Sequence, residues 1–402
     1  MREMKDSGVL NLGIIPRNWK VTKCKYLMEI QSGESLSKED LDEDGIYPVY
    51  GGGECIGYTK SRNVNSKQLL VGRVGARCGC VNRLSSDAWA TDNSLVISCK
   101  CNRNYLYYLL MALNLNSLNT ANAQPLITGS KIKNCSVAYS DDVQEQQRIA
   151  DYLDDKCSKI DSIIAKQEEI IEKLKEYKLS VITEAVTKGL NPDVKMKESE
   201  VGFLNSIPKN WQEKQIRYLF SLRDEKNYLP LEDVTLLSLY TDLGVFPHGE
   251  QEERGNKAVT AEGYKVVYKD DIVVNIILAW MGAIGISAYD GITSPAYDIY
   301  KPEDEVCSKF YHYLFRTKLF SGECYKYGRG IMAMRWRTYS SEFKSIRVPV
   351  PSYKEQVEIV EFLDKKCANI DKTINDRNLV INKLQEYKKS LIYEVVTGKK
   401  EV

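Results

Sequence analysis

One stretch that occurs twice decides the fold. Residues 145–164 read EQQRIADYLDDKCSKIDSII, and residues 355–374 read EQVEIVEFLDKKCANIDKTI. With a constant shift of 210, the correspondence continues without a gap to residues 187 and 397. A repeat of this length indicates that the chain contains two copies of one structural unit.

The repeated stretch predicts two long helices. Its apolar residues recur at spacings of three, four or seven, which places them in one stripe along a helix. Asp142 and Ser352 are expected to cap the starts with Glu145 and Glu355 in capping boxes, and Gly189 and Gly398 to end the helices. Each helix would be roughly 65 Å long, with an apolar stripe that cannot be left in water. We therefore expect the helices to pack on each other through Leu153, Ile160, Ile164, Ile171, Leu174, Leu363, Ile370, Ile374, Ile381 and Leu384.

A second match precedes each helix, so the repeating unit is a whole module. Ile15 to Trp19 reads IPRNW, and Ile207 to Trp211 reads IPKNW. Between these openings and the helices the two sequences diverge, and glycine-rich turns there indicate short strands. We expect a strand over 68–74, a helix over 105–113 and a buried strand pair within 272–286. The expected fold class is α+β, with two β-rich domains separated by two long antiparallel helices in a pseudo-two-fold internal repeat.

The net charge of +1 over 402 residues gives no global argument for a nucleic-acid partner, but local composition does. Residues 55–86 and 324–341 contain basic and aromatic side chains and no acidic residue, and residues 55–86 also contain amide side chains. This composition is typical of loops that face DNA. The side chains predicted to contact DNA are Tyr58, Lys60, Arg73, Arg77, Asn82, Arg83 and Trp89 in the first module, and Asn275, Trp280, Arg329, Arg335 and Trp336 in the second.

Several function classes find no support in the sequence. Residues 1–10 are charged and lack the apolar region of a signal peptide, and the most apolar run, residues 272–286, is too short to span a bilayer, so we expect a cytoplasmic protein without membrane contact. The eleven cysteines are expected to be reduced, and the pairs Cys78/Cys80 and Cys99/Cys101 to alternate along strands rather than bind zinc. Motifs for methyl transfer, metal-dependent cleavage and a phosphate loop are absent. His248 and His312 are isolated and are interpreted as structural or solvent-exposed rather than catalytic. We thus predict no catalytic residue, no metal site and no cofactor of its own.

Together, these motifs resemble the specificity (S) subunit of type I restriction-modification systems, over essentially the whole chain. Besides the two IPxxW openings and the two Glu-Gln helix starts, the resemblance rests on motifs that lie between them in order. These are Tyr50 to Gly53, Val71 to Gly75, Trp89 to Asn93, Trp280 to Gly285, Ser294 to Tyr297 and Val348 to Pro351. Ser136 to Tyr139 departs from the family pattern because it lacks the prolines of Val348 to Pro351.

The resemblance implies a domain plan and a function. Residues 1–141 and 191–351 would be target recognition domains, each reading one half of an interrupted DNA site. Residues 142–190 and 352–402 would be helical spacers that fix the distance between the halves and dock two methyltransferase subunits, with motor-nuclease restriction subunits completing the complex. S-adenosylmethionine, ATP and Mg would then belong to the partner subunits. From the periodicity alone, a coiled-coil adaptor that holds two globular heads without binding DNA remains the alternative, and a self-sufficient restriction enzyme is disfavoured by the missing motifs.

Overall fold

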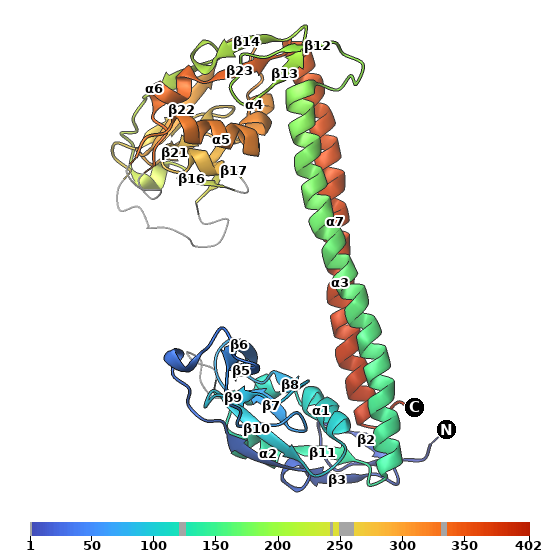
Figure 1. Ribbon diagram of the computed structural model, residues 1–402. Helices are drawn as coiled ribbons and strands as arrows, with labels where there is room; N and C mark the ends of the chain where they lie inside the picture. The colour runs from blue at the N-terminus through green and yellow to red at the C-terminus, as the bar shows by residue number, and fades with distance from the viewer. Residues whose placement is uncertain (1, 120–125, 242–243, 249–260, 331–335) are drawn as a thin grey trace. The chain divides into compact units, whose positions relative to one another are not determined.

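A computed structural model describes residues 2–119, 126–241, 244–248, 261–330 and 336–402 of the chain. The chain forms two compact units, unit 1 from residues 1–168 and 377–402, and unit 2 from residues 169–376. Two long helices, α3 (Val143–Lys188) and α7 (Tyr353–Val396), each contribute one part to each unit (Figure 1). The helices start where the predicted boundaries at 142 and 352 lie, but the compact units cut across the four predicted ranges because the helices are shared.

The ends of both helices follow from local sequence. Oδ1 of Asp142 accepts the backbone N–H of Gln144 at 2.8 Å, and Oγ of Ser352 accepts that of Glu355 at 3.3 Å. Gly189 and Gly398 follow the last turns with φ of +77° and +71°, a left-handed conformation that glycine adopts without strain. The predicted starts and stops are therefore confirmed.

The reciprocal half of each capping box is a wrong prediction. Instead of reaching back to the helix start, Oε2 of Glu145 accepts the indole N–H of Trp19 at 3.0 Å. Oε2 of Glu355 accepts the side-chain amide of Asn210 at 3.3 Å. In both copies a tertiary partner from the IPxxW opening competes successfully for the glutamate, which ties that opening to the first turn of the helix.

Unit 1 is built around a four-stranded antiparallel sheet in the order β4-β10-β7-β8, beside a three-stranded sheet in the order β6-β5-β9. Its strands are β1 (Met4–Asp6), β2 (Ile14–Pro16), β3 (Lys20–Lys23), β4 (Met28–Ser32), β5 (Tyr47–Gly51), β6 (Glu54–Thr59), β7 (Leu69–Gly72), β8 (Val81–Arg83), β9 (Trp89–Ala90), β10 (Ser94–Cys99) and β11 (Ser136–Tyr139). Its short helices are α1 (Arg103–Ala112) and α2 (Gly129–Asn134). The predicted strand at 68–74 and helix at 105–113 correspond to β7 and α1.

Unit 2 repeats the four-stranded sheet in the order β15-β22-β19-β20. Its strands are β12 (Met196–Glu198), β13 (Ser206–Pro208), β14 (Gln212–Gln215), β15 (Phe220–Arg223), β16 (Leu237–Tyr240), β17 (Gly244–Pro247), β18 (Lys265–Val267), β19 (Ile272–Asn275), β20 (Ile284–Ile286), β21 (Gly291–Thr293), β22 (Tyr297–Pro302) and β23 (Arg347–Val350). Its short helices are α4 (Ser308–Phe315), α5 (Lys318–Tyr327) and α6 (Ser340–Ser345). The antiparallel pair β19 and β20 confirms the strand pair predicted within 272–286.

In each unit the parts of α3 and α7 run antiparallel and join the core. In unit 1, Asp161 pairs with Lys388 at 2.7 Å, and Gln167 accepts a hydrogen bond from Arg377 at 2.6 Å. In unit 2, Lys178 pairs with Asp371 at 2.7 Å, which is the unit 1 ion pair with the two helices exchanged. Both IPxxW tryptophans are buried where these helices meet the domain, at 0% and 1% exposure.

The structure also bears on the cysteines and on membrane contact. All eleven cysteines are free. Cys78 and Cys80 lie in the turn between β7 and β8, so the prediction that this pair alternates along a strand was wrong. Within the described ranges, no helix is both long and apolar enough to cross a bilayer.

Candidate nucleic-acid interface

The glutamine of each Glu-Gln motif holds the β-rich domain of its unit on the start of its helix. Oε1 of Gln146 accepts the backbone N–H of Asn102 at 3.1 Å, and Oε1 of Gln356 accepts that of Cys307 at 2.9 Å. Asn102 and Cys307 are the residues that precede α1 and α4. Both glutamine side chains are buried, so the motif fixes equivalent helices in the two domains.

In unit 1 glycine-rich loops bring part of the predicted DNA-contacting set together. Gly53, between β5 and β6, has a φ of +106°, and a Cβ there would lie 3.1 Å from the carbonyl oxygen of Arg77. The side-chain amide of Asn82 donates to the carbonyl of Gly53 at 3.0 Å. Arg73 lies in the same loop as Arg77 and donates to Oγ of Ser32 at 3.3 Å. Arg73, Arg77 and Asn82 thus share one edge of the domain.

The basic segment 55–86 is less positive in the fold than in the sequence. Four of its six basic side chains pair with carboxylates that lie outside the segment, in the pairs Lys60–Asp42, Arg62–Asp87, Arg77–Glu54 and Arg83–Asp154. Lys60 and Arg77 remain well exposed, at 69% and 60% of their side-chain surface. The ion pairs of Lys60 and Arg77 are therefore solvent-exposed and contribute little to stability.

Arg83 lies apart from the loop edge. Its guanidinium contacts Oδ1 of Asp154 in α3 at 2.5 Å and stacks over the ring of Tyr107 at 4.4 Å. The structure therefore gives Arg83 a contact with the helix, and its assignment to DNA stays a prediction. Trp89 also has a partner within the domain, since its indole N–H donates to the backbone carbonyl of Glu34 at 3.2 Å. Tyr58 on β6, in contrast, is 50% exposed.

In unit 2 three aromatic side chains gather at one surface. Trp336 stacks on Tyr325 with ring centroids 4.9 Å apart, and Tyr325 meets Trp280 edge-on at 5.9 Å. Close to this stack, the backbone of Arg329 pairs with that of Arg337, and the Arg329 guanidinium contacts Glu342 at 2.8 Å. Arg335 lies outside the described residues.

Asn275 is placed differently from the other predicted residues of unit 2. The residue is only 9% exposed. Its Oδ1 accepts the backbone N–H groups of Ile277 and Leu278 at 3.0 and 3.3 Å. It shapes the turn that carries Trp280 instead of presenting its amide. Tyr325 was missed as a candidate, although its place in the acid-free segment beside Trp336 was a usable signal.

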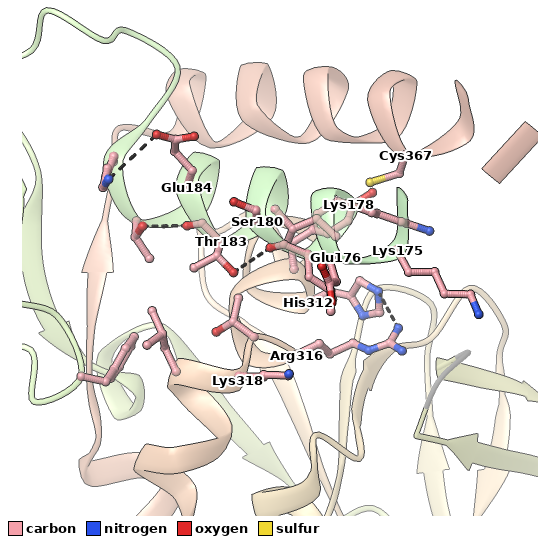
Figure 2. A pocket seen from close by; sticks show the side chains of 18 of the residues that line it. Lys175, Glu176, Lys178, Ser180, Thr183, Glu184, His312, Arg316, Lys318 and Cys367 are labelled. Atoms are coloured by element: carbon pink, nitrogen blue, oxygen red, sulfur yellow. Dashed lines mark hydrogen bonds and ion pairs between the residues drawn. The ribbon is translucent and has the colours of Figure 1, made fainter. Parts of the chain in front are cut away.

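The residues predicted to pack the helices divide into two classes. Leu153, Ile160, Ile171, Leu363, Ile370 and Ile381 are buried, and Ile164, Leu174, Ile374 and Leu384 are half-buried. In unit 2 an open groove of about 1650 Å³ lies between α3, α7 and the α4–α5 region. Figure 2 shows Lys175, Lys178 and Thr183 of α3 on one side of it and His312, Arg316 and Lys318 on the other.

Two titratable groups have environments that set their charge. Burial lowers the pKa of His312 to about 3, and Arg316 and Lys309 act in the same direction. Burial, followed by the hydrogen bond to Asp154, raises the pKa of Tyr108 far above its ordinary value, so its hydroxyl remains a donor. Among the residues that the structure describes, no group of three or more His, Cys, Asp or Glu side chains could hold a metal ion.

Comparison with known proteins gives a consistent result. The type I restriction modification DNA specificity domain matches twice, at residues 16–176 and 208–383. The type I restriction enzyme EcoprrI specificity subunit of Escherichia coli is 31% identical over 134 residues, which cover 32% of this chain and only 33% of that protein. The type I restriction enzyme EcoDI specificity subunit of Escherichia coli is 22% identical over 94% of this chain and 88% of its own.

A solved structure shares the fold. A chain from a type I R-M system, studied for its complex assembly and conformational transition, superposes with a TM-score of 0.69. The superposition covers 96% of this chain and 99% of that chain, with 10% sequence identity.

Proposed function

Since the chain belongs to the family of type I restriction modification DNA specificity proteins, we propose that it selects the DNA sequence on which a type I restriction-modification complex acts. One observation carries the proposal. The two units repeat one sheet order and one docking arrangement, yet their exposed loops differ: glycine loops with Arg73, Arg77 and Asn82 in unit 1, and an aromatic stack beside Arg329 in unit 2. Equivalent frames with unlike surfaces suit two readers of unlike half-sites.

Each reader would combine positioning contacts with base contacts. Exposed lysines such as Lys60 suit phosphates, whereas arginine suits guanine edges and asparagine suits adenine edges in the major groove. The chain itself would have a non-catalytic role. Methyl transfer and cleavage, with S-adenosylmethionine, ATP and Mg, are assigned to partner subunits.

We assign methyltransferase docking to the outer faces of the two helices. Tyr177 in unit 2 and Tyr387 in unit 1 occupy equivalent repeat positions and are 47% and 54% exposed. Leu379 in unit 1 and Leu179 in unit 2 add exposed apolar surface at 57% and 48%. Because each unit has one such face, we expect two methyltransferase subunits to bind per chain. Restriction subunits would then join that assembly. Native mass spectrometry of the purified complex counts the subunits directly. A single methyltransferase per chain would contradict this assignment.

The experiment for sequence selection uses the complex of this chain with its partner methyltransferase and a pool of random duplexes. Sequencing the bound fraction should return one interrupted motif, and affinity should fall steeply as salt rises, because phosphate contacts release counterions. A bound fraction without any motif, or binding that does not respond to salt, would favour a coiled-coil adaptor that carries two heads for another purpose.

A further inference from the structure

Asp154 and Asp364 lie at equivalent positions of α3 and α7, and both reach across to the domain beside them. Oδ1 of Asp154 accepts the hydroxyl of Tyr108 in α1 at 2.7 Å. Oδ1 of Asp364 accepts the hydroxyl of Tyr313 in α4 at 2.7 Å. Each aspartate therefore joins a spacer helix to the helix that its glutamine also holds.

Each carboxylate also pairs with a basic side chain, and the two units supply that side chain from different elements. Asp154 pairs with Arg83, which comes from strand β8, at 2.5 Å. Asp364 pairs with Lys309, which comes from helix α4, at 2.6 Å. The equivalent helices α1 and α4 supply the tyrosine, whereas the cationic side chain reaches the same carboxylate position from different elements of two domains with almost no sequence in common. A common requirement at that position explains this convergence better than inherited sequence does.

The two contacts on each helix act as a pair because of their separation. Gln146 lies in the first turn of α3 and Asp154 lies eight residues further along, a distance of about 12 Å along the helix axis. Between these two polar contacts Ile149 and Leu153 pack in the core of the domain, a contact without directional hydrogen bonds. The two polar contacts, about 12 Å apart, add the directional restraint that sets the angle of the domain on the helix.

We propose that Asp154 and Asp364 are positioning residues that fix the angle of each recognition domain on its helix pair, and through that angle the number of base pairs allowed between the two half-sites. The inference rests on the proposed function. It gives the aspartates no contact with DNA, so the sequence of each half-site should not depend on them.

The test maps methylated adenines in a host that carries this chain and its methyltransferase, for the wild type, Asp154→Ala, Tyr108→Phe and Asp155→Ala. Asp155 is a matched control, since it is the neighbouring carboxylate and pairs only with Lys156 and Lys159 of its own helix among the described residues. Tyr108→Phe keeps the buried ring and removes only the hydroxyl that reaches Asp154.

We expect the wild type and Asp155→Ala to methylate one interrupted motif with a single spacing. In Asp154→Ala and Tyr108→Phe, the same half-sites should also be methylated at spacings one base pair longer or shorter. The preference for the native spacing should fall about tenfold, a change that corresponds to about 1.4 kcal/mol.

Three results would overturn the inference: fewer methylated sites at unchanged spacing, which indicates a merely structural role; an altered half-site sequence, which indicates base reading; or the same loosened spacing in Asp155→Ala. A wild-type chain that directs no interrupted motif would instead sink the proposed function itself. The two failures are therefore distinguishable.

Discussion

At the scale of single residues, Arg77 and Lys60 are both basic and exposed but differ in their surroundings. Arg77 stands on the glycine-loop edge with Asn82, and Lys60 follows the end of β6 beside Asp42. We expect Arg77→Ala to weaken target binding by about 1–3 kcal/mol and relax one base position, whereas Lys60→Ala should weaken all sequences alike and lower the salt slope by about one. Selection from random duplexes at several salt concentrations measures both effects, and equal losses on target and random DNA for Arg77→Ala would rule out direct readout.

Gly398 is a residue where both backbone and space require glycine. Its φ is +71°, and a Cβ there would lie 2.4 Å from Cγ of Pro16. Gly8 has a similar φ of +69° with nothing within 4 Å, so it reports the backbone cost alone. Gly8→Ala should cost roughly 1–2 kcal/mol from the left-handed backbone, and Gly398→Ala about 1–3 kcal/mol more from overpacking. Urea denaturation of the full chain checks the order, and equal midpoints would show that the Pro16 contact relaxes freely.

The lowered pKa of His312 predicts that the stability of the folded chain depends on pH. Its folded pKa of about 3 lies below its ordinary value of 6.5, so the unfolded chain takes up the proton first as pH falls. The contribution to stability is complete above pH 6.5 and is lost on acidification toward pH 3. Between about pH 7.5 and 5.5 the free energy of unfolding should fall by about 1.4 kcal/mol. This is the effect of one proton that the unfolded chain binds over the one pH unit below 6.5. His312→Asn keeps an acceptor for the N–H of Ile286 and should flatten this slope in denaturation curves; an unchanged slope would contradict the assignment.

Residue-scale prediction succeeded where neighbours in sequence decide the outcome and failed where distant ones do. The caps at Asp142 and Ser352 were predictable because they depend on residues two or three positions away. The contact of Arg83 with Asp154 could not, because the partner lies 71 residues away and the acid-free segment gives no sign of it. The inward turn of Asn275 depends likewise on a loop conformation that one sequence does not reveal.

At the scale of elements, the long helices were predictable because caps and apolar periodicity are local signals that agree with each other. Leu363 and Phe362 test the inner and outer faces of α7, being 0% and 41% exposed. Leu363→Ala should destabilise the chain by about 2–5 kcal/mol through the cavity it leaves. Phe362→Ala should change stability by only about 0.5 kcal/mol. Thermal and urea unfolding compare the two, and a larger loss for Phe362→Ala would reverse the predicted faces.

The part of element structure that sequence did not predict is how the elements are joined. Glu145 and Glu355 suggested capping boxes, but the IPxxW openings offered the two carboxylates other donors. The sheet order β4-β10-β7-β8 required long-range pairing that no local pattern encodes. Each unit contains one part of α3 and one part of α7 because the two helices pack antiparallel. The order of segments along the chain does not reveal this division.

At the scale of the whole molecule, a duplicated frame carries two different surfaces, so recognition is divided while support is shared. Changes in one unit should then alter one half of the target and leave the other half intact. Arg77 in unit 1 and Arg329 in unit 2 are the exposed arginines that test this, with 60% and 75% of their side chains accessible.

A methylation map of hosts that carry the wild type, Arg77→Ala or Arg329→Ala with the partner methyltransferase shows directly whether the two units read separate half-sites. We expect an interrupted motif for the wild type, with one position relaxed in one half by Arg77→Ala and one position relaxed in the other half by Arg329→Ala. A continuous wild-type motif, or two substitutions that relax the same half, would contradict this expectation.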